Sequence, residues 1–189
     1  MILRLAWLAA LTCGVALASA EARAYPQIDF EPESTRFNAA TEEYREIWRT
    51  EGERISKALE TATGLEMEAG PIRAIVFEGI SNSGYKRQPM RMRASYPPGT
   101  KRATLVHELA HRLISDFVSK DGEDHPIIFL FVYDVWVQLW GQEFADEQVA
   151  VESERRGHYD YESAWRHALA LGREGRAARW KLFLGRSRR

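Results

Sequence analysis

Cysteine is nearly absent from this sequence, since Cys13 is the single one among 189 residues. This excludes a disulfide framework and any zinc site built on cysteines. An excess of one charge is lacking too, because 26 Lys and Arg residues stand against 27 Asp and Glu residues. That balance argues against bulk nucleic-acid binding. With 45% hydrophobic and 28% charged residues, the chain has the composition of a globular protein, neither disordered nor a multi-span membrane protein.

The first 24 residues have the pattern of a secretory signal peptide. Arg4 supplies a positive charge, Leu5–Ala18 is a mostly apolar stretch, and small residues offer cleavage after Ala20 or Ala24. The apolar stretch is shorter than the roughly 20 residues that a transmembrane helix needs. We therefore predict that residues 1–24 export the protein to the periplasm or the medium. Retention of the segment as a membrane anchor is the alternative.

Residues 25–189 are expected to form one domain of the α+β class, mainly helical, with a basic C-terminal helix and tail. Residues 25–37 contain two prolines and no clear period, which predicts an extended arm. Apolar residues at helical spacing or in strand alternation predict the other elements. The predicted strands are 73–78 and Met90–Ser95, and the predicted helices are about 38–62, 101–117, 126–140, 142–156, 161–172 and 174–184.

The chemical signal in this chain is an H-E-x-x-H motif formed by His107, Glu108 and His111. It lies in the predicted helix 101–117, for which Thr100 is the expected N-cap. On a helix, positions i and i+4 are about 40° apart, so both imidazoles can point at one ion. Neutral imidazole suits Zn²⁺, and a catalytic zinc site uses three protein ligands plus water. Glu108 is rotated by about 100° from the first histidine, where it would act as general base on a metal-activated water.

With this motif the chain resembles the zincins, a class of H-E-x-x-H zinc metallopeptidases. The order of helix, strand, strand, motif helix and further helices is similar to a minimal zincin core over about residues 38–140. The resemblance implies a short β-hairpin or small sheet whose edge strand pairs with an extended peptide substrate. Met90–Ser95 is the candidate edge strand. The alternative is that this strand presents an arginine-lined face to solvent.

Two kinds of residue compete for the third metal ligand. His125 lies fourteen residues after His111, where a polar loop meets the next helix. This spacing resembles SprT-like zincins, in which the third histidine begins the helix after the motif helix, and the resemblance implies His125 as the ligand. The rival is a glutamate from a later helix, as in gluzincins. The candidate glutamates are Glu143, Glu147 and Glu152.

Asp134 stands among apolar residues, so its carboxylate needs a partner. That partner is either the far nitrogen of a ligand histidine or a structural arginine. A tyrosine or histidine that hydrogen-bonds the transition-state oxyanion is usual in zincins, and His158, Tyr159 and Tyr161 are candidates by residue type alone. The tail Arg173–Arg189 is either a solvated terminal helix or a contact with anionic lipid or polymer.

These observations predict an exported zinc-dependent endopeptidase. His107, His111 and His125 would hold Zn²⁺, and Glu108 would be general base and acid. The expected partner is a peptide or protein substrate, with no nucleic acid, and membrane contact only through the signal segment or the basic tail. The DNA-linked role of SprT-like proteins does not carry over, because those proteins act inside cells. The alternative is a non-catalytic binding or scaffold protein on a zincin-like fold.

Overall fold

The computed structural model describes residues 25–84, 88–118, 124–155 and 159–187. The predicted signal segment 1–24 therefore lies outside the described residues. The described part is a mainly helical α+β fold, which confirms the predicted fold class. In chain order the elements are β1 (Ile28–Pro32), the 3-10 helix η1 (Thr35–Phe37), α1 (Asn38–Thr63), β2 (Ile72–Phe77), β3 (Met90–Arg93), α2 (Pro98–Ile114), α3 (His125–Ile128), α4 (Val132–Trp140), α5 (Gln142–Ser153), α6 (Tyr161–Ala170) and α7 (Gly172–Ser187).

The three strands form one parallel sheet in the order β1-β2-β3. Ala74 in β2 faces Met90 in β3, and the two strands run in the same direction. Two expectations are corrected here. The arm predicted at 25–37 contains β1, and β2 and β3 do not form a hairpin. The connection between them, residues 78–89, is long enough to carry the chain back to the starting end of the sheet, whereas a hairpin needs only a tight turn.

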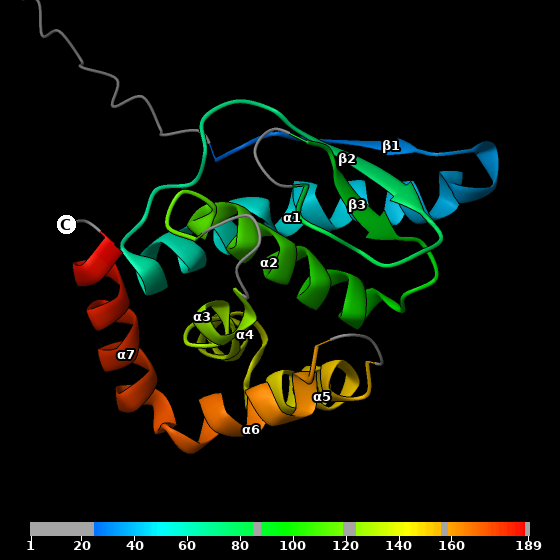
Figure 1. The fold of residues 1–189 in the computed structure, drawn as a ribbon. Helices are drawn as coiled ribbons and strands as arrows, with labels where there is room; N and C mark the ends of the chain where they lie inside the picture. The colour runs from blue at the N-terminus through cyan, green and yellow to red at the C-terminus, as the bar shows by residue number, and fades with distance from the viewer. Residues whose placement is uncertain (1–24, 85–87, 119–123, 156–158, 188–189) are drawn as a thin grey trace, which may run out of the picture.

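One face of the sheet is buried and the other faces solvent. Phe30, Val76 and Met92 are buried against the helical side, where α1 and α2 lie (Figure 1). The solvent face carries arginines paired with acidic residues across the sheet and its flanks, namely Arg73 with Glu31, Arg91 with Glu33, and Arg93 with Glu78. This is the arginine-lined face considered for Met90–Ser95, although the strand itself ends at Arg93.

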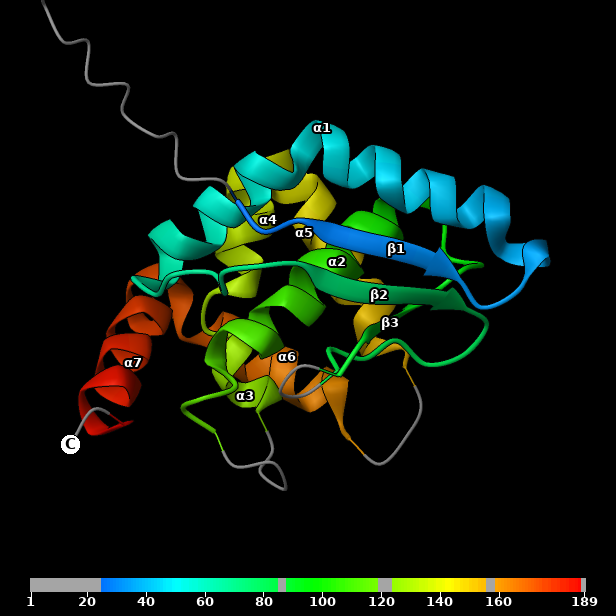
Figure 2. The same ribbon diagram turned by 90° about the horizontal axis from the view of Figure 1, so that it is seen from above.

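Helix α2 occupies the centre of the molecule. It lies between the sheet and the C-terminal helices (Figure 1), and the view from above shows it behind the sheet (Figure 2). The helix begins at Pro98, because proline suits the first turn, and Thr100 lies inside it rather than capping it. It ends at Ile114, three residues before the predicted end. Leu105 and Leu109 are fully buried, since neighbours cover α2 on more than one side.

The C-terminal helices wrap around the far side of α2. The predicted helix 126–140 is divided into α3 and α4, which are separated by a short non-helical stretch. The basic helix α7 packs on the core, because Trp180 is buried and its Nε1 donates a hydrogen bond to the Thr63 carbonyl at 2.9 Å. None of the described helices combines the length and apolarity that crossing a bilayer requires.

Candidate metal centre

Three histidines converge beside α2. His107 and His111 lie on successive turns of this helix, and His125 is the first residue of α3. Their candidate ligand atoms all lie within 4.8 Å of one another. The Nε2 atoms of His107 and His111 are 3.0 Å apart. The structure thus brings together the three residues that the sequence analysis named as ligands.

Carboxylates hold the outer nitrogens of two of these histidines. Oε1 of Glu152 lies 2.9 Å from Nδ1 of His107, although the two atoms are not aligned as a full hydrogen bond. Oδ2 of Asp124 lies 2.7 Å from Nδ1 of His111. A carboxylate favours a proton on the nitrogen that it faces. Each of the two rings therefore presents Nε2 as its lone-pair nitrogen toward the other ring.

The donor set fits a metal ion. With protons on both Nδ1 atoms, the lone pairs of His107 and His111 face each other across 3.0 Å, and a proton or cation between them removes the repulsion. Zinc–nitrogen distances of about 2.0–2.1 Å in a tetrahedral site place ligand nitrogens roughly 3.3 Å apart, close to this spacing. Burial lowers the pKa of His107 to about 4, so its ring is neutral, as a metal ligand must be.

The pKa of His111 is shifted in the opposite direction, upward. Burial alone would lower its pKa, but the hydrogen bond with Asp124 and the charge of Glu108 raise it. In the metal-free protein a proton is therefore held between the two Nε2 atoms more readily than on an exposed histidine. A metal ion would displace that proton, because metal binding requires deprotonated ligands.

Glu152 supports His107 and does not join the ligand cluster. Its side chain is 2% exposed, and its second oxygen accepts a hydrogen bond from Nε1 of Trp165 at 3.0 Å. Burial alone would raise the pKa of Glu152, but His107 and Arg155 lower it to about 2, so it stays charged. The other glutamates considered as ligands lie exposed on α5, outside the cluster, at Glu143 and Glu147.

Glu108 follows His107 directly on α2 and is buried, with 4% of its surface exposed. Burial raises the pKa of its carboxyl to about 7, while the charges of His111 and Arg155 oppose that rise. A carboxyl group with a pKa near neutrality can both accept and release a proton at physiological pH. Glu108 is thus a buried acid, with a raised pKa, on the helix that carries two of the three histidines.

Aromatic side chains form one wall of the site. The hydroxyl of Tyr161 lies 3.0 Å from Nε2 of His125, and the ring of Tyr159 stacks on the same histidine at 4.4 Å between centroids. Behind them, Phe129 stacks on Trp165 at 3.7 Å. Tyr161 was a candidate oxyanion donor by residue type, whereas nothing in the sequence signalled that Trp165 would hold the carboxylate behind the site. The third candidate, His158, lies outside the described residues.

The partner of Asp134 is an arginine and not a ligand histidine. Both oxygens accept hydrogen bonds from Arg176 on α7, at 2.8 and 2.9 Å. This is the structural pair that the sequence left open, and it fastens the last helix to α4. The carboxylate that supports a histidine from the loop side is Asp124 instead. The sequence analysis missed its role, although Asp124 directly precedes His125.

The edge of strand β3 is already bonded within the chain. The N–H and C=O of Arg91 pair with the C=O and N–H of Asn82, each at 2.9 Å. The N–H of Arg93 donates to the Ser81 hydroxyl at 3.0 Å, and its carbonyl accepts from the Tyr44 hydroxyl at 2.9 Å. Strand β3 lies at the sheet edge, as the zincin resemblance implied. Its outward backbone groups, however, are not open to an extended peptide.

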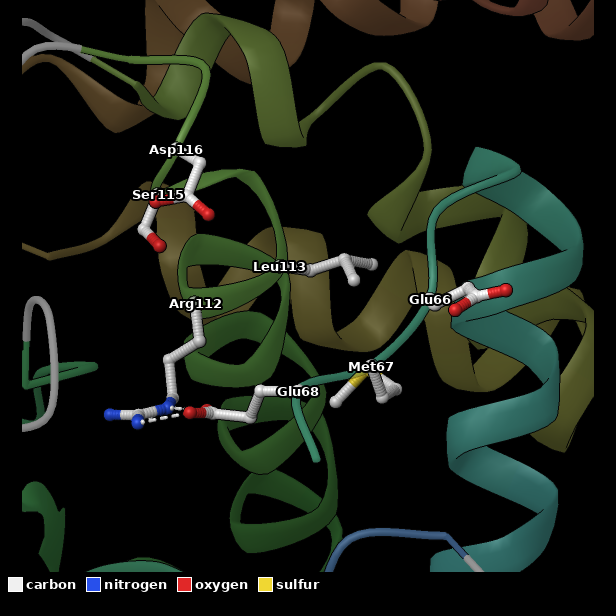
Figure 3. Close-up of a pocket in the computed structure, with 7 residues that line it drawn as sticks. All are labelled: Glu66, Met67, Glu68, Arg112, Leu113, Ser115 and Asp116. Atoms are coloured by element: carbon white, nitrogen blue, oxygen red, sulfur yellow. Dashed lines mark hydrogen bonds and ion pairs between the residues drawn. The ribbon is translucent and has the colours of Figure 1, made fainter. Parts of the chain in front are cut away.

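A cavity of about 380 Å³ opens near the C-terminal end of α2, away from the histidine cluster (Figure 3). Figure 3 shows Arg112 pointing toward Glu68, and its Nη2 donates to that carboxylate at 2.9 Å. Its Nη1 donates to the carbonyls of Ser83 and Gly84, both at 2.8 Å. Arg112 is thereby engaged in holding two connecting segments against α2, which is a structural role.

Comparisons with protein-family models, with curated proteins and with solved structures found no match to this chain.

Proposed function

We propose that this protein is an exported zinc-dependent metallopeptidase with a zincin-type centre. The observation that carries the proposal is the convergence of His107, His111 and His125 with a buried glutamate beside them. Carboxylates behind two of the histidines add support, because such partners fix the ring orientation in metal sites. The described residues bring three side chains to this point. A structural zinc site commonly uses four protein ligands, whereas a catalytic one uses three.

The residues divide the work of hydrolysis. A zinc ion held by the three histidines would supply Lewis acidity, polarising a scissile carbonyl and lowering the pKa of water. Glu108 takes a proton from the attacking water on its carboxylate and delivers it to the leaving amine. Burial favours the neutral form of this carboxyl group, which helps it to hold the proton between the two transfers. The Tyr161 hydroxyl, which lies 3.0 Å from Nε2 of His125, is the candidate hydrogen-bond donor to the developing oxyanion.

The test is Glu108→Gln, which keeps the size of the side chain and removes its ability to take a proton. We expect this variant to bind as much zinc as the parent and to lose at least ~100-fold in peptide hydrolysis. Zinc would be measured by elemental analysis of the purified protein, and hydrolysis with a mixed peptide library and mass spectrometry.

The matched control is Glu143→Gln, which removes an exposed carboxylate on α5. It should leave both zinc content and hydrolysis unchanged. Hydrolysis that persists in Glu108→Gln would refute the assigned role of Glu108. A zinc-loaded parent that cleaves no peptide in the library would favour a non-catalytic binding protein.

A further inference from the structure

Arg155 follows α5 and places its guanidinium beside the candidate active site. Its Nη2 reaches the hydroxyl of Thr104 at 3.5 Å, and its Nη1 reaches Oε1 of Glu152 at 3.4 Å. Its Cζ lies 5.6 Å from the ring centre of Tyr161 and 6.0 Å from that of Tyr96. The guanidinium thus lies among groups that contact or flank the histidine cluster.

The position along α2 is also informative. Thr104 lies three residues before His107 and four before Glu108, so all three share one side of the helix. Arg155 therefore contacts α2 at Thr104, one helical turn before the residues proposed to carry the chemistry. Burial alone would lower the pKa of Arg155, but nearby groups, Glu152 and Glu108 among them, raise it, so the guanidinium stays charged.

The contacts of Arg155 with Glu152 and Thr104 are weak compared with those of the buried Arg176. Charge-assisted hydrogen bonds of arginine are normally about 2.7–2.9 Å long. Arg176 makes two bonds of that quality to Asp134, at 2.8 and 2.9 Å. The contacts of Arg155 with Glu152 and Thr104, at 3.4 and 3.5 Å, are much longer. Arg155 also interacts with the Tyr161 hydroxyl, and a fifth of its side chain remains exposed. Its planar fork of N–H donors is thus able to take a better acceptor.

The backbone groups at the edge of β3 are already hydrogen-bonded, which disfavours substrates that bind by strand addition. Strand addition holds a long peptide on both sides of the scissile bond through its backbone. In this protein Ser81 and Asn82 occupy the outward backbone groups of the strand. A peptide that binds through the charge of its terminal carboxylate does not need to pair with the edge of β3.

We propose that Arg155 binds the C-terminal carboxylate of a peptide substrate, so that the enzyme removes residues from peptide C-termini. This inference rests on the proposed peptidase function. Successive carbonyl carbons of a peptide are about 3.5 Å apart. Arg155 contacts Thr104, one turn of α2 before Glu108, so a carboxylate on Arg155 would bring the adjacent peptide bond within reach of that turn. Water adds to the carbonyl carbon of that bond, the C–N bond breaks, and the amine leaves with the proton that Glu108 delivers. The products are a shortened peptide acid and one free amino acid.

The experiment compares one N-acetylated tetrapeptide as its free acid and as its C-terminal amide. Binding would be measured by calorimetry on full-length protein that carries Glu108→Gln, so that the peptide is not hydrolysed, first loaded with zinc and again after chelation. We expect the free acid to bind ~10-fold or more tightly than the amide in both states, as a charge-assisted pair warrants. Arg155→Gln should abolish that preference, and Arg155→Lys should keep part of it. The control Arg49→Gln, an exposed residue on α1, should keep it in full.

The outcomes separate this inference from the proposed function. Equal binding of acid and amide, or a preference that survives in Arg155→Gln, would overturn the role of Arg155. A preference that disappears on chelation would assign the carboxylate to the metal and overturn it too. Cleavage of internal bonds in amidated peptides at the rate seen for free acids would overturn the C-terminal specificity while leaving the peptidase proposal intact. If the free acid binds more tightly because of Arg155 but no peptide is cleaved, Arg155 is a carboxylate-binding residue. The proposed peptidase function is then refuted.

Discussion

Glu152→Gln is the substitution that most sharply separates a supporting carboxylate from a metal ligand. In the structure one oxygen faces Nδ1 of His107 at 2.9 Å, and the other accepts a hydrogen bond from Trp165 at 3.0 Å. Glutamine has nearly the same volume, so the packing is kept. It offers one acceptor oxygen and one donor amide, however, to two N–H groups. The amide NH₂ must therefore face one of these two N–H groups, which is unfavourable, and the negative charge behind His107 is lost.

The size of the effect follows from what the carboxylate does. It fixes the protonation and orientation of the His107 ring and makes Nε2 a stronger donor to a metal. Removing such a partner costs about 10- to 100-fold in metal affinity, or about 1.4–2.7 kcal/mol. We expect Glu152→Gln to bind zinc with the parent stoichiometry and with a dissociation constant raised by that factor.

The assay is competition with a chromophoric zinc chelator at pH 7.5. Glu147→Gln is the matched control, because this glutamate lies exposed on the same helix and was considered as a ligand in the sequence. It should leave the dissociation constant unchanged. A dissociation constant for Glu152→Gln within twofold of the parent value would refute the supporting role. Complete loss of zinc would indicate instead that Glu152 is itself a ligand.

Three further predictions concern stability, each measured by urea denaturation. Asp134→Ala should lower the free energy of unfolding by about 3 kcal/mol, because it leaves the side chain of Arg176, only 4% exposed, without its carboxylate. Arg176→Met should lower it by about 2 kcal/mol, because the carboxylate of Asp134 is 22% exposed and can be hydrated. A larger loss for Arg176→Met than for Asp134→Ala would contradict this reasoning. Gly84→Ala should cost about 3 kcal/mol or more, because its φ is +62° and a Cβ would lie 2.3 Å from a backbone carbonyl oxygen. Gly64→Ala, at φ +68° with open space around it, should cost about 1 kcal/mol, and equal losses would refute the steric argument. Burial alone would raise the pKa of Glu51, but hydrogen bonds from guanidinium and indole groups lower it. Its stabilisation is therefore present above its ordinary pKa of 4.5, and the parent's advantage over Glu51→Gln should shrink as the pH falls through the lowered value; an advantage that grows in acid would contradict the sign.

The sequence was sufficient for elements that depend on local patterns. The motif helix was predicted at 101–117 and is found at Pro98–Ile114, because a strong amphipathic repeat and a preceding proline act within the segment itself. Strand β1 was missed for the opposite reason. Two prolines suggest an irregular arm, and residues 28–32 become a strand through pairing with β2, which is far away in the sequence.

The relative direction of β2 and β3 could not be predicted from the local sequence pattern either. Alternation of buried and exposed residues is the same in a hairpin and in a parallel pair. The parallel arrangement of β2 and β3 depends on the path of residues 78–89. That path in turn depends on tertiary contacts such as the hydrogen bonds of Arg112 to the carbonyls of Ser83 and Gly84.

The candidate site was predicted in part. The spacing of His107 and His111 is a property of one helix, so the sequence could name them. His125 was named through a resemblance, since nothing in the spacing alone brings a residue fourteen positions after His111 back onto the motif helix. The supporting groups at Asp124 and Glu152 came only with the structure, because no local pattern tells which carboxylate will lie behind which imidazole.

The central claim is that three histidines of this chain hold one zinc ion. The most direct measurement is zinc bound per chain, by equilibrium dialysis, for the parent protein and for His107→Ala, His111→Ala and His125→Ala. Circular dichroism of each variant would show that the helices are retained. We predict one zinc per parent chain and a large loss of affinity in every variant. No zinc on the parent, or parent-like binding by His125→Ala, would contradict the three-histidine centre.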